Sequence, residues 1–147
     1  MKLSEIEPTL AKLPPVCTRR VLYGEVDKMD FVYYGHYLAW FEHGRNEYLR
    51  LCGLPYTEVE DRGVMLPVFE SHVWYIEPVR YDDLVEIRCA ITECTKASAT
   101  FLFALVVDGK RVAAGYTRHA CLGTERRPAR LPEWLREKVL ERYDVGM

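Results

Sequence analysis

The sequence predicts an α+β domain in which a single curved antiparallel sheet packs against one long helix. An amphipathic helical segment is expected at residues 36–52, and four strand-like segments follow it at 66–77, 84–93, 99–107 and 111–122. Strands that follow one another without intervening helices favour an antiparallel sheet over a doubly wound parallel one. A chain of 147 residues is long enough for one such domain with its own buried core.

The N-terminal part of the chain is expected to hold a lead segment and the first strand. Residues 1–15 form the lead, in which a short helix ends before Pro14 and Pro15. Residues 16–26 then predict a strand, because β-branched and aromatic side chains such as Val21 recur there. An acidic segment separates this strand from the long helix.

The long helix at residues 36–52 carries its apolar residues at near-helical spacing, which is typical of a helix with one buried face. Gly53 and Pro55 end it, since glycine favours left-handed turns and proline cannot continue a helix. A short helical turn is expected over residues 56–62, closed by Gly63. The residues that recur at this spacing are Tyr37, Leu38, Phe41, Tyr48, Leu49 and Cys52.

The later strands differ in how their apolar residues are arranged. Segment 84–93 alternates between apolar and polar side chains, as in a strand with one buried face. Segment 99–107 is nearly all apolar, as in a strand covered on both faces. Asp108 and Gly109 predict a tight hairpin turn into the last strand, and a C-terminal helix is expected over residues 132–143.

Composition and charge exclude several classes of function. Apolar residues make up 49% and charged residues 29% of the chain, as in a folded globular domain. The net charge of −2 gives no support for nucleic-acid binding. No apolar run is long enough to span a bilayer, and the acidic N-terminus is unlike a signal peptide, so a cytoplasmic protein is expected.

Cysteine and histidine usage predicts neither a metal site nor a disulfide. The five cysteines are an odd number, are widely spaced and include no Cys-x-x-Cys motif, so reduced thiols are expected. The four histidines are scattered, with no pair at metal-binding spacing. The sequence also has no Gly-x-Ser-x-Gly elbow and no glycine-rich phosphate loop.

The most informative segment runs from Tyr23 to Glu42 and is typical of a strand, an acidic turn and the start of the long helix. This order brings the carboxylate of Asp27 close to a helix N-terminus, where unpaired backbone N–H groups favour negative charge. A base beside such a helix end is suited to attack on a carbonyl. The alternative role for Asp27 is an Asx turn or a solvated surface acid.

The same segment resembles the hot-dog-fold acyl-CoA thioesterases of the 4-hydroxybenzoyl-CoA type, in which one curved antiparallel sheet wraps around a long central helix. The resemblance covers about residues 17–135. It implies an acyl-CoA thioesterase, with coenzyme A as part of the substrate and no other cofactor. Its motifs lie at Tyr23–Asp27, Met29, Val32–Leu38, Phe41–Glu42, Arg45, Pro67–Glu70, Pro78–Asp83 and Arg127–Pro132.

The resemblance assigns roles to residues of the acidic turn and the helix start. Asp27 matches the family's catalytic aspartate and is expected to act as nucleophile or general base. Tyr34 is expected to act through its backbone N–H, which would polarise the thioester carbonyl. Apart from the resemblance, Tyr33 and His36 are expected to line the substrate pocket, and the alternatives for His36 are helix capping and a role as catalytic acid or base. Asp30 replaces the glycine that is usual in the family, and aspartate tolerates a positive φ better than most residues.

Further substrate-binding residues are expected along the chain. Glu70 lies in an apolar strand, so its carboxylate needs a partner, which is expected to be Arg45 or a group in the pocket. Glu42 and Arg45 are three residues apart on the helix and are expected to form an ion pair. The basic cluster that contains Arg126 and Arg127 is expected to bind the phosphates of coenzyme A.

The resemblance also implies a homodimer or homotetramer with its sites at the subunit interface, and a single sheet with open edges agrees with this. Three alternatives to the hydrolase are open: an acyl-thioester hydratase or dehydratase on the same fold, a non-catalytic acyl-CoA-binding or regulatory module, and a protein-scaffolding role. The position of Asp27 before the helix, rather than on it, disfavours the hydratase.

Overall fold

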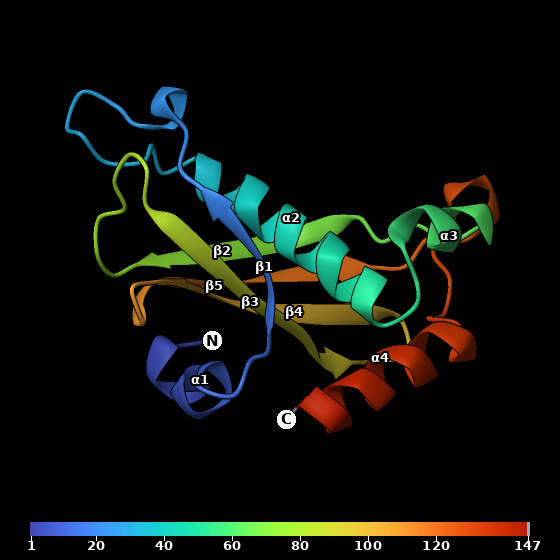
Figure 1. Ribbon diagram of the computed structural model, residues 1–147. Helices are drawn as coiled ribbons and strands as arrows, with labels where there is room; N and C mark the ends of the chain where they lie inside the picture. The colour runs from blue at the N-terminus through green and yellow to red at the C-terminus, as the bar shows by residue number, and fades with distance from the viewer. Residues whose placement is uncertain (147) are drawn as a thin grey trace.

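One five-stranded antiparallel sheet, in the order β1-β3-β4-β5-β2, forms the frame of the computed structural model (Figure 1). The structure describes the backbone of residues 1–146 and the side chains of residues 1–140. The strands are β1 (Pro15–Arg20), β2 (Val68–Tyr75), β3 (Leu84–Cys94), β4 (Ser98–Val107) and β5 (Lys110–Ala120). The helices are α1 (Leu3–Leu10), α2 (His36–Leu51), α3 (Tyr56–Asp61) and α4 (Glu133–Gly146), with 3₁₀ turns η1 (Tyr23–Glu25) and η2 (Thr124–Arg126).

The long helix α2 lies across one face of the sheet and is held there by aromatic contacts (Figure 1). Phe41 stacks on Phe103 of β4, with ring centroids 4.3 Å apart and planes 7° apart. Tyr48 meets Phe101 edge-on at 6.0 Å. Gly115 on β5 allows this close approach, because a Cβ at that position would collide with the Phe41 ring. The predicted packing of one sheet against one long helix is therefore confirmed.

The first strand is shorter than the sequence predicts. A strand was expected over residues 16–26, but β1 ends at Arg20. The N–H of Val21 donates to the carbonyl of Asp83 (2.9 Å), and the chain then turns through η1. The carboxylate of Glu25 accepts a backbone N–H inside this turn (2.8 Å) and so stabilises it in place of a continued strand.

The remaining elements follow the sequence closely. Asp108 and Gly109 have φ values of 50° and 76°, so the predicted tight turn between β4 and β5 is confirmed. The C-terminal helix extends to Gly146 rather than ending at residue 143. In the lead segment, α1 covers the face of the sheet opposite α2, where Leu10 and Ala104 line one surface hollow. No helix among the described residues has the length and apolar character needed to cross a membrane.

Candidate active site

The acidic turn between η1 and α2 is a closed loop. Its two ends pair through an isolated bridge between Val26 and Val32. Within it, the Asp27 N–H donates to the carbonyl of Phe31 (2.9 Å), and the Asp30 N–H donates to the carbonyl of Asp27 (3.0 Å). Asp30 has a φ of 63°, in the left-handed region that aspartate tolerates better than most residues. The loop thus adopts one defined turn, and Asp30 fits it.

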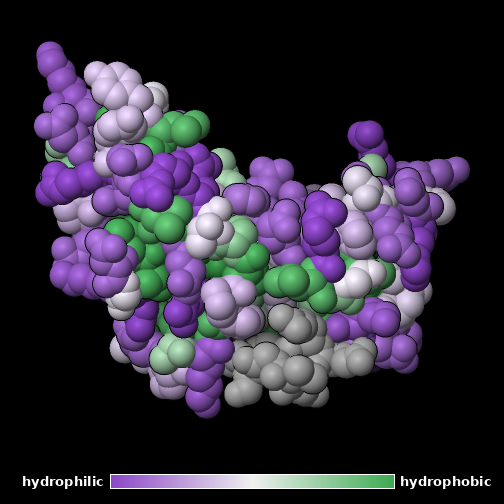
Figure 2. All heavy atoms as spheres, viewed as in Figure 1, coloured by the Kyte–Doolittle hydropathy of each residue, from purple (hydrophilic) through white to green (hydrophobic). Residues whose placement is uncertain are grey.

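The side chain of Asp27 is exposed in this loop, which projects from the upper left of the molecule (Figure 2). Its Oδ1 accepts the N–H of Met29 (2.9 Å), which is an Asx turn. Among the described residues no donor lies on its Oδ2, so this oxygen is open to a substrate or to water. The carboxylate borders a groove of about 460 Å³. The other groove residues are Tyr23, Val26, Lys28, Asp30, Arg80 and Tyr81.

The backbone N–H of Tyr34 lies just before the first turn of α2. The helix begins at His36, and Gly35 occupies the N-cap position. Within the described residues the Tyr34 N–H donates no hydrogen bond, whereas the Tyr34 carbonyl accepts bonds from the N–H of Tyr37 (3.4 Å) and the hydroxyl of Tyr75 (3.1 Å). The Tyr75 bond ties Tyr34 to β2. An unpaired amide at a helix N-terminus is a good donor to an anionic oxygen.

Tyr33 and His36 lie beside the Asp27 loop. The Tyr33 ring centroid is 4.6 Å from that of Tyr34 and 5.9 Å from that of His36. The pKa of the Tyr33 hydroxyl is raised, mainly by its hydrogen bond with the Tyr34 side chain and to a lesser extent by the negative charge of Asp27. The capping alternative for His36 was wrong, because Gly35 holds the N-cap and no side chain caps the helix.

Comparison with known proteins decides the family. The sequence pattern described as the thioesterase-like superfamily matches residues 21–139, a span that includes the loop, α2 and the strands β2 to β5. The chain belongs to the thioesterase-like superfamily. Membership confirms the expected thioester hydrolase at the level of the family, and it leaves the 4-hydroxybenzoyl-CoA type as a prediction.

Individual relatives of this thioesterase-like chain agree with the family. A protein of Aquifex aeolicus named as a candidate esterase is 30% identical over 107 residues, which are 73% of this chain and 84% of that one. The acyl-CoA thioester hydrolase YbgC of Escherichia coli is 33% identical over 82 residues, 56% of this chain and 61% of YbgC. The crystal structure of a hypothetical protein from Aquifex aeolicus is similar with a TM-score of 0.81 and 27% identity, over 86% of this chain and 99% of that one. The expected hot-dog fold is thus confirmed.

In this thioesterase-like protein Glu70 lies on the face of the sheet opposite α2. Its carboxylate accepts hydrogen bonds from the hydroxyl of Tyr116 (2.6 Å) and the guanidinium of Arg118 (3.1 Å), and the Tyr116 bond is the main cause that lowers the Glu70 pKa. Tyr116 and Arg118 lie on one face of β5, and Gly115 lies on the other face, toward α2. The expected partner Arg45 was therefore wrong, because strand alternation turns Glu70 outward.

Arg126 and Arg127 lie at the far end of the molecule from the loop. The segment η2 follows β5 and lies beside α3, where a Cβ at Gly63 would be 3.9 Å from the Thr124 methyl group. Figure 1 shows this end of the molecule on the right and the blue loop at the upper left. Within one chain, these arginines and Asp27 are not brought together.

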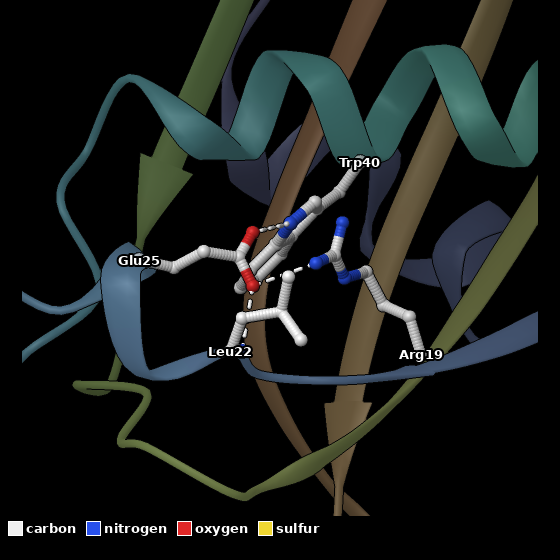
Figure 3. Close-up of polar contacts among 4 residues, drawn as sticks. All are labelled: Arg19, Leu22, Glu25 and Trp40. Carbon is white, nitrogen blue, oxygen red and sulfur yellow. Dashed lines mark hydrogen bonds and ion pairs between the residues drawn. The ribbon is translucent and has the colours of Figure 1, made fainter.

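Glu25 lies next to the loop and is buried, which nothing in the sequence periodicity indicates. Its carboxylate accepts hydrogen bonds from Arg19, Leu22 and Trp40 (Figure 3). The residue lies in a short turn, which has no periodic pattern of apolar residues from which its burial could be predicted. The signal that was available is the Glu-x-Asp spacing to Asp27, with an arginine on the preceding strand.

A small polar cavity of about 80 Å³ lies between the C-terminal half of α2 and the sheet, and Glu42, Arg45 and His119 are among its lining residues. The expected Glu42–Arg45 ion pair is not formed among the described residues. Burial lowers the pKa of Arg45, although the charge of Glu42 acts in the opposite direction. His119 bonds the carbonyl of Leu66 through Nδ1 (2.8 Å) and the hydroxyl of Thr117 through Nε2 (2.8 Å). A neutral imidazole with its proton on Nδ1 satisfies both bonds.

Burial lowers the pKa of His119 from 6.5 to about 4, so the fold is expected to lose stability in mild acid. Above pH 6.5 the folded and unfolded chains both hold neutral His119. Below it only the unfolded chain gains the proton, so the free energy of unfolding falls until the pH reaches the folded pKa. We expect a loss of about 2 kcal/mol between pH 7 and pH 5, measured by urea unfolding. The His119→Gln variant should flatten this dependence, and a wild type equally stable at both pH values would contradict the expectation.

Proposed function

We propose that this protein is an acyl-CoA thioesterase, which hydrolyses an acyl-CoA to the free acid and coenzyme A. One observation carries the proposal. The exposed carboxylate of Asp27 lies in a loop that leads directly into α2, where the N–H of Tyr34 has no partner among the described residues. A base or nucleophile and an oxyanion donor thus come from one short segment. The name of YbgC and the family membership support the same activity.

In the proposed mechanism Asp27 acts in one of two ways. As a general base, its Oδ2 takes a proton from water while the water oxygen attacks the thioester carbonyl carbon. As a nucleophile, Oδ2 attacks that carbon itself, and water then hydrolyses the resulting anhydride. In both cases the Tyr34 N–H stabilises the oxyanion, the C–S bond breaks and the coenzyme A thiolate leaves. No cofactor takes part, and coenzyme A enters only as part of the substrate.

The acyl group is proposed to lie against Tyr33 and His36. Both side chains are beside the loop, and the Tyr33 and Tyr34 rings are only 4.6 Å apart. An aromatic surface of this kind suits an aromatic acyl group, because flat rings pack well against one another. This packing supports the finer proposal of a 4-hydroxybenzoyl-CoA-type enzyme.

A homodimer or homotetramer is proposed because β2 is an open edge of the sheet. The outer backbone groups of an edge strand are unpaired, and a second copy can cover them. The same edge exposes large apolar side chains, at Val68, Phe69, Tyr75 and Ile76.

Light scattering of the purified protein is expected to give a mass of two or four chains. Phe69 is 60% exposed at the β2 edge, so a Phe69→Lys variant should shift the protein toward a monomer. Leu84 is 46% exposed on β3, which lies toward the opposite edge of the sheet from β2, and Leu84→Lys should leave the mass unchanged. A monomeric wild type at working concentration would contradict the proposal.

The proposed oligomer also affects which residues can bind coenzyme A. One chain holds Arg126 and Arg127 away from Asp27, so we propose that these arginines meet the phosphates of a substrate bound in another subunit. Among the described residues of one chain, the basic groups nearest the Asp27 groove are Lys28 and Arg80, which line it.

The alternatives are separated by a turnover assay. A panel of acetyl-, medium-chain, long-chain and aromatic acyl-CoAs is incubated with the protein, and free coenzyme A is followed by chromatography, because accessible cysteine thiols of the protein also react with a thiol dye. Hydrolysis of at least one substrate is expected. Saturable binding without turnover would favour the non-catalytic binding module. Addition of water to an enoyl thioester would favour a hydratase, which the position of Asp27 before α2 disfavours. A cytoplasmic location stays a prediction.

A further inference from the structure

Glu25 is a buried carboxylate that receives three hydrogen bonds from three different elements. The residue is 8% exposed. Its Oε1 accepts the guanidinium N–H of Arg19 on β1 (2.6 Å) and the backbone N–H of Leu22 before η1 (2.8 Å). Its Oε2 accepts the indole N–H of Trp40 on α2 (3.0 Å). Figure 3 shows these groups converging on the carboxylate.

The charge of Glu25 is matched by one cation. The Arg19 guanidinium bonds this carboxylate and also lies over the Trp40 ring, 5.0 Å from its centroid. Within the described residues, the buried Nε of Arg19 has no hydrogen-bond partner. A carboxylate that is removed from water is stable only when such donors replace the water. If the Glu25 carboxylate were removed, the buried Arg19 guanidinium would be left without its partner, which is equally unfavourable. The Arg19–Glu25–Trp40 group therefore holds β1, η1 and α2 together as one unit.

The backbone of Glu25 closes the Asp27 loop. Its carbonyl accepts the N–H of Tyr33 (2.9 Å), which joins the two ends of the loop at this residue. Asp27 follows Glu25 by two residues on one side of that bond, and Tyr34 follows Tyr33 directly on the other side. The position of Glu25 thus determines how the Asp27 carboxylate and the Tyr34 N–H lie relative to each other.

We propose that Glu25 is a positioning residue for thioester hydrolysis, which holds Asp27 and the Tyr34 amide in their reactive arrangement through its bonds to Arg19, Leu22 and Trp40. This proposal rests on the proposed function. Glu25 itself does not touch the substrate, because its oxygens are occupied by donors of the protein. Displacement of a reacting group by about 1 Å can cost a hundredfold in rate, so a group that holds both partners affects the chemical step.

The first test is Glu25→Gln, in which the side chain keeps its size and loses the charge that Arg19 needs. We expect kcat per folded molecule to fall by about 10- to 100-fold while KM changes by less than about threefold, since the loss concerns the chemical step rather than binding. Hydrogen exchange gives a readout that needs no activity. The amides of residues 26–34 should exchange faster in the variant, while those of β3 and β4 keep their protection.

Two further variants sharpen the test. Glu47→Gln alters an acid that pairs with Arg50 on the same helix (3.5 Å), and it should leave kcat and loop exchange unchanged. Trp40→Phe removes the donor to Oε2 and part of the buried ring that Arg19 covers, but it keeps the Arg19–Glu25 pair. It should lower kcat in the same direction but by a smaller factor, and it tests the proposal if Glu25→Gln does not fold.

The outcomes separate this proposal from the proposed function. If Glu25→Gln melts at a lower temperature but keeps wild-type kcat and wild-type loop exchange, Glu25 is only structural and the proposal fails. If Asp27→Asn abolishes turnover in the same experiment, the proposed function still stands. If the wild type hydrolyses no acyl-CoA of the panel, the proposed function fails and the positioning role fails with it. A selective loss of kcat with faster loop exchange supports the proposal.

Discussion

Replacement of Asp27 by asparagine is expected to lower kcat for acyl-CoA hydrolysis by about a hundredfold or more. Asparagine has nearly the same size, and its side-chain oxygen still accepts the Met29 N–H that now bonds Oδ1 at 2.9 Å. The loop should therefore keep its shape, while the group that takes a proton or attacks the carbonyl is lost. Release of free coenzyme A, followed by chromatography for wild type and variant, measures the effect.

The matched control for this experiment is Asp30→Asn in the same loop. Asp30 has a φ of 63°, and asparagine is among the residues that tolerate this conformation best. The control removes one negative charge from the loop without removing the open Oδ2 of Asp27, so kcat should stay within about threefold of wild type. Equal activity of Asp27→Asn and wild type, or an equal loss in both variants, would reject the assigned role of Asp27.

The elements that carry a regular pattern of apolar and polar residues were predictable from the sequence. Apolar residues on one face predict helix α2, and alternating apolar and polar residues predict most of β3. The turn at Asp108 and Gly109 was predictable because only a few residue types accept its positive φ values. In each case the cause is local, so neighbouring residues contain the whole signal.

The site was predictable only in part, because its side-chain partners come from distant segments. Asp27 stands out by its place before a helix, but the partners of a carboxylate depend on register and burial. Glu70 pairs with Arg118, 48 residues away, and not with Arg45. Glu25 is held by Trp40, 15 residues away and on another element. Neither pairing follows from spacing along the chain, since each arises only when the sheet and α2 are assembled.

Replacement of Leu49 by alanine is expected to lower the free energy of unfolding by about 2–5 kcal/mol, the range for deletion of a buried leucine side chain. Leu49 is 2% exposed, in the C-terminal half of α2, and it already borders the small cavity that Arg45 and His119 line. Removal of its side chain enlarges a space that the packed sheet cannot fill by collapse. Urea unfolding at pH 7 measures the change.

Leu51→Ala is the control, because Leu51 is 49% exposed on the same helix. Residues two apart on a helix point about 200° apart, so this variant removes the same atoms from the opposite face and should change the free energy of unfolding by less than about 0.5 kcal/mol. Equal losses in both variants would mean that α2 is not buried by one face as described.

At temperatures where Leu49→Ala stays folded, its kcat should match wild type, because Glu25 and Trp40, not the C-terminal half of α2, hold the loop at the other end of the helix. A loss of kcat in folded Leu49→Ala would show instead that the site depends on the docking of the whole helix.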